Sequence, residues 1–123
     1  MKLTEYLNSI GIDKPIKSVT GSLRIKESVI TEIDLPKLQS IGDYLDIHNN
    51  QQLTQIDLPE LQSVGYSLNI SNNQQLKQID LPELQSVGYS LNFYNNPRLK
   101  ILNNNDYEDE IQIKQALKTQ VGK

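Results

Sequence analysis

The amino-acid sequence predicts a mainly β protein with a helix at each end, whose middle is a short β-solenoid of stacked, similar coils. The first observation is a repeat: the phrase from Asp57 to Leu68 recurs unchanged from Asp80 to Leu91, 23 positions later. The second is the alternation of apolar and polar residues within each copy, which is typical of short strands with one buried face. The third is composition, because 14 Ile and 12 Asn against a single Ala disfavour helices.

Length, charge and cysteine content narrow the class of protein. The 123 residues suit one domain, which we take as residues 1–123. With 12 basic and 15 acidic residues the formal charge is −3, which argues against a nucleic-acid binder that relies on phosphate contacts. The lack of cysteine excludes disulfides, thiolate metal sites and a cysteine nucleophile, and a single histidine excludes a multi-histidine site. We therefore expect neither a metal nor a cofactor.

No targeting signal is recognisable. No run of about 18 apolar residues could form a membrane-spanning helix. Glu5 and Asn8 interrupt the stretch where a secretory signal peptide needs a long apolar segment. We therefore expect a soluble, cytoplasmic protein that does not associate with membranes.

A short capping helix is expected over residues 1–11. Its apolar residues fall at helical spacing on one face: Leu3, Tyr6, Leu7 and Ile10. Gly11 can end the helix. A cap is needed because the end of a solenoid exposes its core and its strand edges.

The repeat solenoid is expected over residues 16–102, with about three full coils and two partial ones. Aligned copies place Leu23, Leu45, Leu68 and Leu91 in one column, followed two residues later by Ile25, Ile47, Ile70 and Phe93. The apolar residues predicted to point inward from one coil are Leu45, Ile47, Leu53, Ile56, Leu58, Leu61 and Val64. One coil cannot bury such a set alone, but coils stacked at about 4.8 Å can.

Turn-forming residues separate the strands, among them Asn49, Pro59 and Gly65. Asn50, Asn73 and Asn96 occupy equivalent turns in successive coils. Their amides can bond backbone groups of their own turn and of the next coil, which would make a structural Asn ladder. The alternative is a row of ligand-binding amides.

A second helix over residues 106–120 is expected to cap the other end. Asp106 is a good N-cap, and Glu108 to Glu110 lie in the first turn. Lys114 and Lys118 lie further along, an order that suits the helix dipole. The apolar stripe would be Ile113, Ala116 and Leu117.

The phrase from Leu58 to Asn73 resembles the repeat of receptor L domains, a family related to the leucine-rich repeats and found in the insulin and epidermal growth factor receptors and in fungal cell-wall proteins. The resemblance covers about residues 16–102 and rests on the spacing and on the Asn, Pro and Gly positions. It implies a right-handed β-solenoid that binds other macromolecules without catalysis. Because cysteines and a secretion signal are lacking, small cytosolic or phage-encoded proteins with similar repeats are the closer comparison.

Outward positions beside the strands change from coil to coil, whereas the inward positions do not. The candidate partner-binding residues on this face are Asp46, His48, Asn69, Ser71, Asn92 and Tyr94, with Tyr66 and Tyr89 near their edge. A variable face on a regular scaffold can encode one partner, but exposed positions can also simply drift. The two tyrosines either stack on each other or anchor a partner.

Two other groups of residues contain side chains of types found in catalytic or metal sites. His48, Asp46 and Ser71 supply the residue types of a hydrolase triad, but no strained nucleophile turn or oxyanion hole accompanies them, so we expect no enzyme. The column Asp34, Asp57 and Asp80 could attract calcium, or each Asp could bond local backbone at a turn. We expect the second and hence no metal site.

These observations favour a non-enzymatic protein–protein interaction module, monomeric on its own, that docks an unidentified protein partner through its strand face. One alternative is a small inhibitor encoded by a phage or mobile element that blocks a host defence complex. Another is a self-assembling structural protein.

Overall fold

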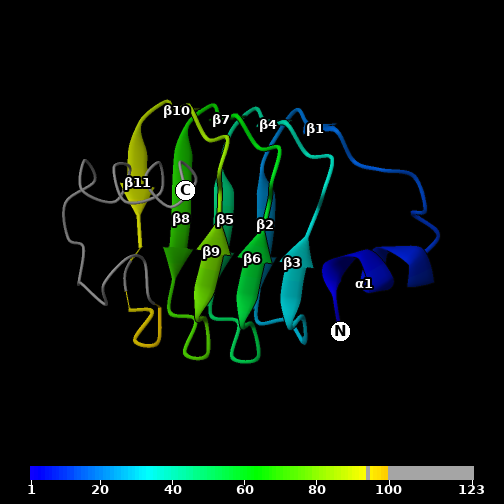
Figure 1. Cartoon of the computed structure of the whole chain (residues 1–123), viewed down its shortest axis with the longest axis vertical. Coiled ribbons are helices and arrows are strands. Elements are labelled where there is room, and N and C mark those ends of the chain that lie inside the picture. Colours follow the sequence, from blue (N-terminus) through cyan, green and yellow to red (C-terminus); the bar gives the residue numbers. More distant parts are fainter. Residues whose placement is uncertain (94, 100–123) are drawn as a thin grey trace.

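The computed structural model describes residues 1–93 and 95–99, which form one helix and three sheets, each made of parallel strands (Figure 1). The helix is α1 (Leu3–Ser9). One sheet has the order β1 (Ser18–Val19), β4 (Ser40–Ile41), β7 (Ser63–Val64), β10 (Ser86–Val87). A second has the order β11 (Ser90–Asn92), β8 (Ser67–Ser71), β5 (Leu45–His48), β2 (Leu23–Lys26). The third has the order β3 (Glu32–Asp34), β6 (Gln55–Asp57), β9 (Gln78–Asp80).

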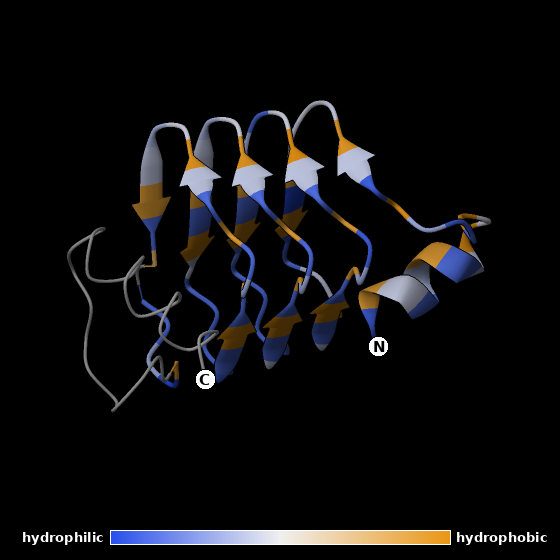
Figure 2. Cartoon of the chain, turned by 45° about the horizontal axis from the view of Figure 1, so that its top comes forward, coloured by the Kyte–Doolittle hydropathy of each residue, from blue (hydrophilic) through white to orange (hydrophobic). Residues whose placement is uncertain are grey.

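Each coil contributes one strand to each sheet in turn, so the predicted short β-solenoid of about three turns is confirmed. The predicted columns are the observed register. Leu23 pairs with Leu45, Leu45 with Leu68, and Leu68 with Leu91. Hydrophobic residues recur at the same place in successive strands (Figure 2), and all seven inward residues predicted for the middle coil are buried. Burying each such side chain stabilises the fold by about 1.5–3 kcal/mol.

The first asparagine of each Asn pair makes the sharp turn after the strand. Asn49, Asn72 and Asn95 have φ of 55°, 56° and 55°, a left-handed conformation that asparagine tolerates better than most residues. In the first coil, which lacks the pair, Glu27 takes this place with φ 50°.

The second asparagine of each pair is buried and joins neighbouring coils. The Asn50 amide nitrogen donates to the Ile25 carbonyl at 2.9 Å, and the Asn73 amide oxygen accepts the Asn50 backbone N–H at 3.0 Å. Asn96 repeats this with the Ile70 carbonyl and the Asn73 N–H. The amides therefore bond backbone groups of the preceding coil, where the sequence predicted backbone groups of their own turn and of the next coil. They also bond one another from coil to coil, as Asn50 Nδ2 does to Asn73 Oδ1 at 3.2 Å. Such bonds matter because an unpaired buried backbone group is costly.

The glycine column Gly42, Gly65, Gly88 reflects close packing rather than turn geometry. None of the three has positive φ. A Cβ on Gly65 would overlap the carbonyl oxygen of Gly42, and one on Gly88 would overlap that of Gly65. Thr20 holds the same place in the first coil, where no preceding coil lies beneath it.

The N-terminal segment covers the edge of the third sheet, since Lys2 bridges to Glu32 and Leu3 is buried (Figure 1). Asp34 holds the helix start by accepting the Thr4 N–H at 3.1 Å and the Thr4 hydroxyl at 2.7 Å. Gly11, with φ 92°, ends the helix as predicted.

The apolar face predicted for this helix is only partly buried. Leu7 packs against the core, whereas Tyr6 and Ile10 are exposed. The predicted helix 106–120 lies outside the described residues, so the capping of that end stays a prediction. In the described part of the chain, no helix is both long and apolar enough to cross a membrane.

Leu68→Ala tests the inward column at its fully buried centre. We expect a loss of about 2–5 kcal/mol in the free energy of unfolding, because burial is lost and a cavity remains. The matched control is Leu23→Ala in the half-buried edge strand of the same column, which should lose less. Equilibrium urea unfolding measures both, and a Leu68→Ala midpoint equal to that of the parent chain would refute the register.

Gly65→Ala tests the close approach of neighbouring turns. We expect a loss of about 1–3 kcal/mol, because the new methyl group forces the turn away from the Gly42 carbonyl. Gly21→Ala is the control, since nothing lies within 4 Å of its Cβ position. That change should be neutral or stabilise by at most about 1 kcal/mol. Equal thermal melting curves for the two variants would contradict this packing constraint.

Candidate functional site

A shallow groove of about 420 Å³ runs across the strand face formed by β2, β5, β8 and β11. We call it the strand-face groove. It is lined by Arg24, Tyr44, Asp46, Tyr66, Ser67, Asn69, Tyr89, Ser90 and Asn92. Four successive coils contribute to it, so its shape depends on the stacking of the solenoid.

One side of the groove is a row of three tyrosines. The Tyr44 and Tyr66 ring centroids are 4.9 Å apart with the planes at 84°, an edge-to-face contact. The Tyr66 and Tyr89 rings stack at 5.0 Å and 20°. The Arg24 guanidinium lies 5.4 Å from the Tyr44 ring centroid, within cation–π range. The contacts hold the rings in place before any partner arrives.

Both expectations left open for Tyr66 and Tyr89 are compatible with this row. The rings stack, yet 69% of Tyr89 remains exposed. The pKa of Tyr66 is raised, chiefly by the neighbouring Tyr44 phenol. At neutral pH the Tyr66 hydroxyl is therefore uncharged, and it can donate and accept hydrogen bonds.

The other side of the groove is polar and internally hydrogen-bonded. The Asp46 carboxylate accepts from His48 Nδ1 at 2.8 Å and from the Asn69 amide at 3.3 Å. The Ser67 and Ser90 hydroxyls lie 2.9 Å apart. Because an ionised carboxylate only accepts, Nδ1 of His48 carries the proton in this bond. The Asp46 side chain is thus held on the strand face between two donors.

Five of the eight predicted partner-binding residues line the groove: Asp46, Asn69, Asn92, Tyr66 and Tyr89. His48 and Ser71 lie further along β5 and β8, opposite each other in the register. Ser71 is only 8% exposed, so it offers a partner little surface. Tyr94 lies outside the described residues.

The hydrolase triad considered from the sequence is not assembled. The His48–Asp46 bond exists, but among the described side chains no hydrogen bond joins His48 to Ser71. Nothing in this arrangement activates the serine hydroxyl as a nucleophile.

Sequence reasoning missed Tyr44 as a groove residue. Tyr44 stands in the column of Ser22, Ser67 and Ser90, one place after the column of Tyr66 and Tyr89. Its ring nevertheless joins their row. The sequence shows a tyrosine in a serine column, but only the side-chain geometry shows that its ring contacts the neighbouring tyrosine column.

An acidic row lies on the third sheet, away from the groove. Asp34, Asp57 and Asp80 are direct neighbours across β3, β6 and β9. The pKa of Asp57 is raised by partial burial first, and then by the negative charges of Asp80, Glu32 and Asp34.

The carboxylates of this row do not share the local backbone bonding expected from the sequence. Asp34 bonds Thr4 of the helix, and Asp80 accepts from the Gln78 amide at 2.7 Å. Within residues 1–93 and 95–99, no group of three or more metal-ligating side chains is arranged to hold a metal ion.

Comparison with known proteins identifies one family. The family model described as Receptor L domain matches residues 16–111, which include every coil of the solenoid. The resemblance inferred from the repeat is thereby confirmed. Neither the curated proteins nor the solved structures gave a significant match.

The raised pKa of Asp57 makes stability depend on pH. The folded state binds the Asp57 proton more tightly than the unfolded chain, whose carboxyl titrates near pH 3.9. The free energy of unfolding therefore falls as the pH rises from about 3.9 through the higher pKa of Asp57 in the folded state. At neutral pH, ionised Asp57 destabilises the fold. We expect Asp57→Asn to raise the melting temperature at about pH 7 and to have little effect at about pH 3, where the carboxyl is protonated in both states.

The control for this experiment is Glu83→Gln, an exposed carboxylate of the same acidic region. The same melting experiments should show a much smaller difference between the two pH values for this variant. A destabilised Asp57→Asn protein at neutral pH would mean that the carboxylate serves an attractive contact.

Proposed function

The chain belongs to the receptor L domain family, and on this premise we propose that its strand-face groove docks a segment of a partner protein. Receptor L domains and short β-solenoids are non-catalytic kinds of domain, and the family is one of protein-interaction modules. The proposal adds the surface used: the groove between the tyrosine row and the Asp46–Asn69–Asn92 column.

The row of packed tyrosines along the groove is the main support for this proposal. Tyrosine and arginine are the residue types enriched at the energetic centres of protein interfaces. Tyr44, Tyr66 and Tyr89 are already packed against one another, so binding would cost little side-chain entropy. Ordering long flexible side chains on binding costs entropy and so lowers affinity. Among the described residues that line the groove, Arg24 is the one such side chain, and its guanidinium already packs over the Tyr44 ring.

The polar side of the groove supports recognition of a particular partner. From the first coil onward the column reads Arg24, Asp46, Asn69, Asn92, so charge lies at one end and neutral amides at the other. A partner with complementary charge would dock in one orientation, because the reverse would bring like charges together. The inward columns repeat almost unchanged, whereas this outward column changes twice, from Arg24 to Asp46 and from Asp46 to Asn69.

The first experiment identifies the partner and its footprint together. A photo-crosslinking amino acid is placed at Asn92 in the groove or, as a control, at Gln85 on the exposed β10 side. Crosslinking is done in the native host, and mass spectrometry identifies the attached protein. The proposal requires one protein that becomes crosslinked to the probe at position 92 and not to the probe at position 85.

With that partner in hand, Tyr89→Ala should weaken binding by about 1–3 kcal/mol, on the scale of an interface hot spot. The melting curve should hardly change, because Tyr89 is largely exposed. Isothermal titration calorimetry measures the affinity, and Gln62→Ala and Gln85→Ala serve as matched surface controls. A footprint on the Gln62–Gln85 side, with Tyr89→Ala binding normally, would overturn the proposal.

A further inference from the structure

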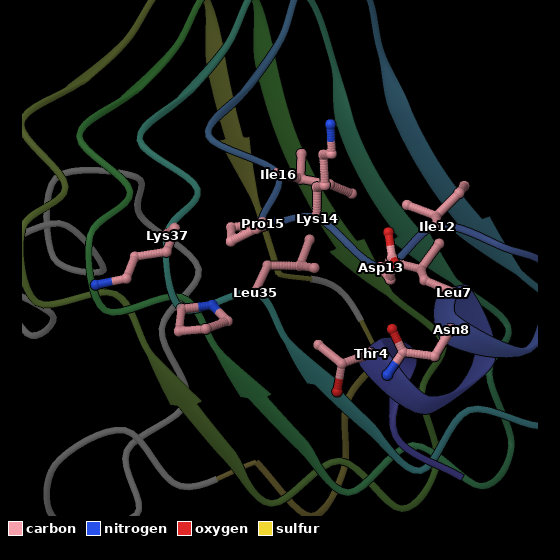
Figure 3. A pocket seen from close by; sticks show the side chains of 11 residues that line it. Thr4, Leu7, Asn8, Ile12, Asp13, Lys14, Pro15, Ile16, Leu35 and Lys37 are labelled. Atoms are coloured by element: carbon pink, nitrogen blue, oxygen red, sulfur yellow. The ribbon is translucent and has the colours of Figure 1, made fainter.

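A second concavity, of about 300 Å³, lies between α1 and the first coil (Figure 3). We call it the cap pocket. Leu7 comes from the helix, Ile12 and Ile16 come from the connector, and Leu35 comes from the loop after β3. These apolar side chains form its wall. The cap pocket is separate from the strand-face groove, with which it shares no lining residue.

Two lysines stand at the rim of the cap pocket. Lys14 and Lys37 belong to its lining, and Figure 3 shows their amino groups pointing outward on different sides. Neither forms an ion pair within residues 1–93 and 95–99. Asp13 is the one carboxylate among the lining residues described. An apolar hollow flanked by two unpaired cations is complementary to an apolar group flanked by anions.

Lys37 departs from the repeat at the place where the cap pocket forms. The segment from Asp34 to Gly42 differs from the segment Asp57 to Gly65 at two of nine positions. One difference is Ile for Val, and the other is Lys37 in place of Glu60. The coil after that has glutamate again, at Glu83. The reversed charge therefore occurs in the coil that borders the pocket.

The N-terminal segment that supplies part of the cap-pocket wall is rich in exposed apolar side chains. Of the seven large hydrophobic side chains that are exposed in the described residues, four lie within residues 1–12: Met1, Tyr6, Ile10 and Ile12. Of these four, Ile12 belongs to the pocket lining itself, so it offers an exposed apolar surface to an occupant of the pocket.

We propose that the cap pocket binds a short acidic segment of a partner protein, with one apolar side chain in the hollow and an acidic residue beside each of Lys14 and Lys37. The charge pattern selects this occupant over a basic or purely apolar peptide. The site does not depend on the strand-face groove, so the solenoid would carry two separate docking surfaces.

The test is a nuclear magnetic resonance titration of the full chain, with Leu, Ile and Val methyl groups labelled. The probes are synthetic hexapeptides with Leu, Ile, Phe or Trp near the centre and Glu and Asp at the flanks. A parallel set has lysine at the flanks. We expect saturable shifts of the Leu7, Ile12, Ile16 and Leu35 methyl signals with an acidic peptide, weakening as salt is added, and no such shifts with the lysine set.

Lys37→Glu supplies a variant that should fold, because glutamate already occupies this position in the next two coils. It should weaken peptide binding by more than about tenfold, since an attraction becomes a repulsion. Lys77→Glu makes the same charge change on an exposed residue outside the pocket lining and should leave the affinity within about twofold. Ile12→Ser should weaken binding without altering the methyl spectrum of the solenoid core.

Several results would overturn the proposal. They are the absence of pocket shifts with every acidic peptide, equal binding of the lysine-flanked set, or equal losses for Lys37→Glu and Lys77→Glu. Vesicles rich in phosphatidylserine form a separate arm. Vesicle binding that shifts the same methyl signals, without any peptide binding, would assign the surface to membranes instead.

Discussion

The fixed distance between neighbouring coils is the constraint from which the rest of the structure follows. Parallel strand pairing holds equivalent residues about 4.8 Å apart along the stack. At the glycine turns this distance leaves no room for a Cβ, since one on Gly65 would overlap the Gly42 carbonyl oxygen. The same distance lets the Asn73 amide reach both Ile47 and Asn50 of the coil before it. Spacing, rather than any single contact, therefore decides which residues the repeat must keep.

Outside the core, the same spacing turns single substitutions into continuous surfaces. Tyrosines in one column become a stacked row, as Tyr66 and Tyr89 are at 5.0 Å. Aspartates in one column become neighbours, so the pKa of Asp57 is raised first by partial burial and then by the negative charges beside it. A solenoid can thus amplify one residue type into a binding wall or a charged stripe. In this chain the wall borders a groove, while the acidic stripe lies on a different sheet.

How far the sequence predicts this structure depends on repetition. Leu45, Leu68 and Leu91 could be assigned to one buried column because each copy confirms the others. Their outward neighbours Asp46 and Asn69 followed from strand alternation. Tyr44 was missed because it stands in a serine column and its ring reaches the neighbouring tyrosine column. The cap pocket was missed because Leu7, Ile12 and Lys14 belong to no repeat. Gly65 was assigned to turn geometry, because a recurring glycine looks the same in sequence whether the turn or the close approach of a neighbouring backbone requires it.

The identity of the two middle phrases has a consequence for how the chain finds its native arrangement. Asp57 to Leu68 and Asp80 to Leu91 have the same sequence, so a stack displaced by one whole coil would bury side chains of the same kinds in these segments. Only non-repeated contacts distinguish the correct frame. In the described part of the chain, the Ser28 hydroxyl bond to the Asn50 amide oxygen and the Thr4 hydroxyl bond to Asp34 each occur once, at the N-terminal end. The first coil and its helix therefore fix which coil stacks on which in the native structure.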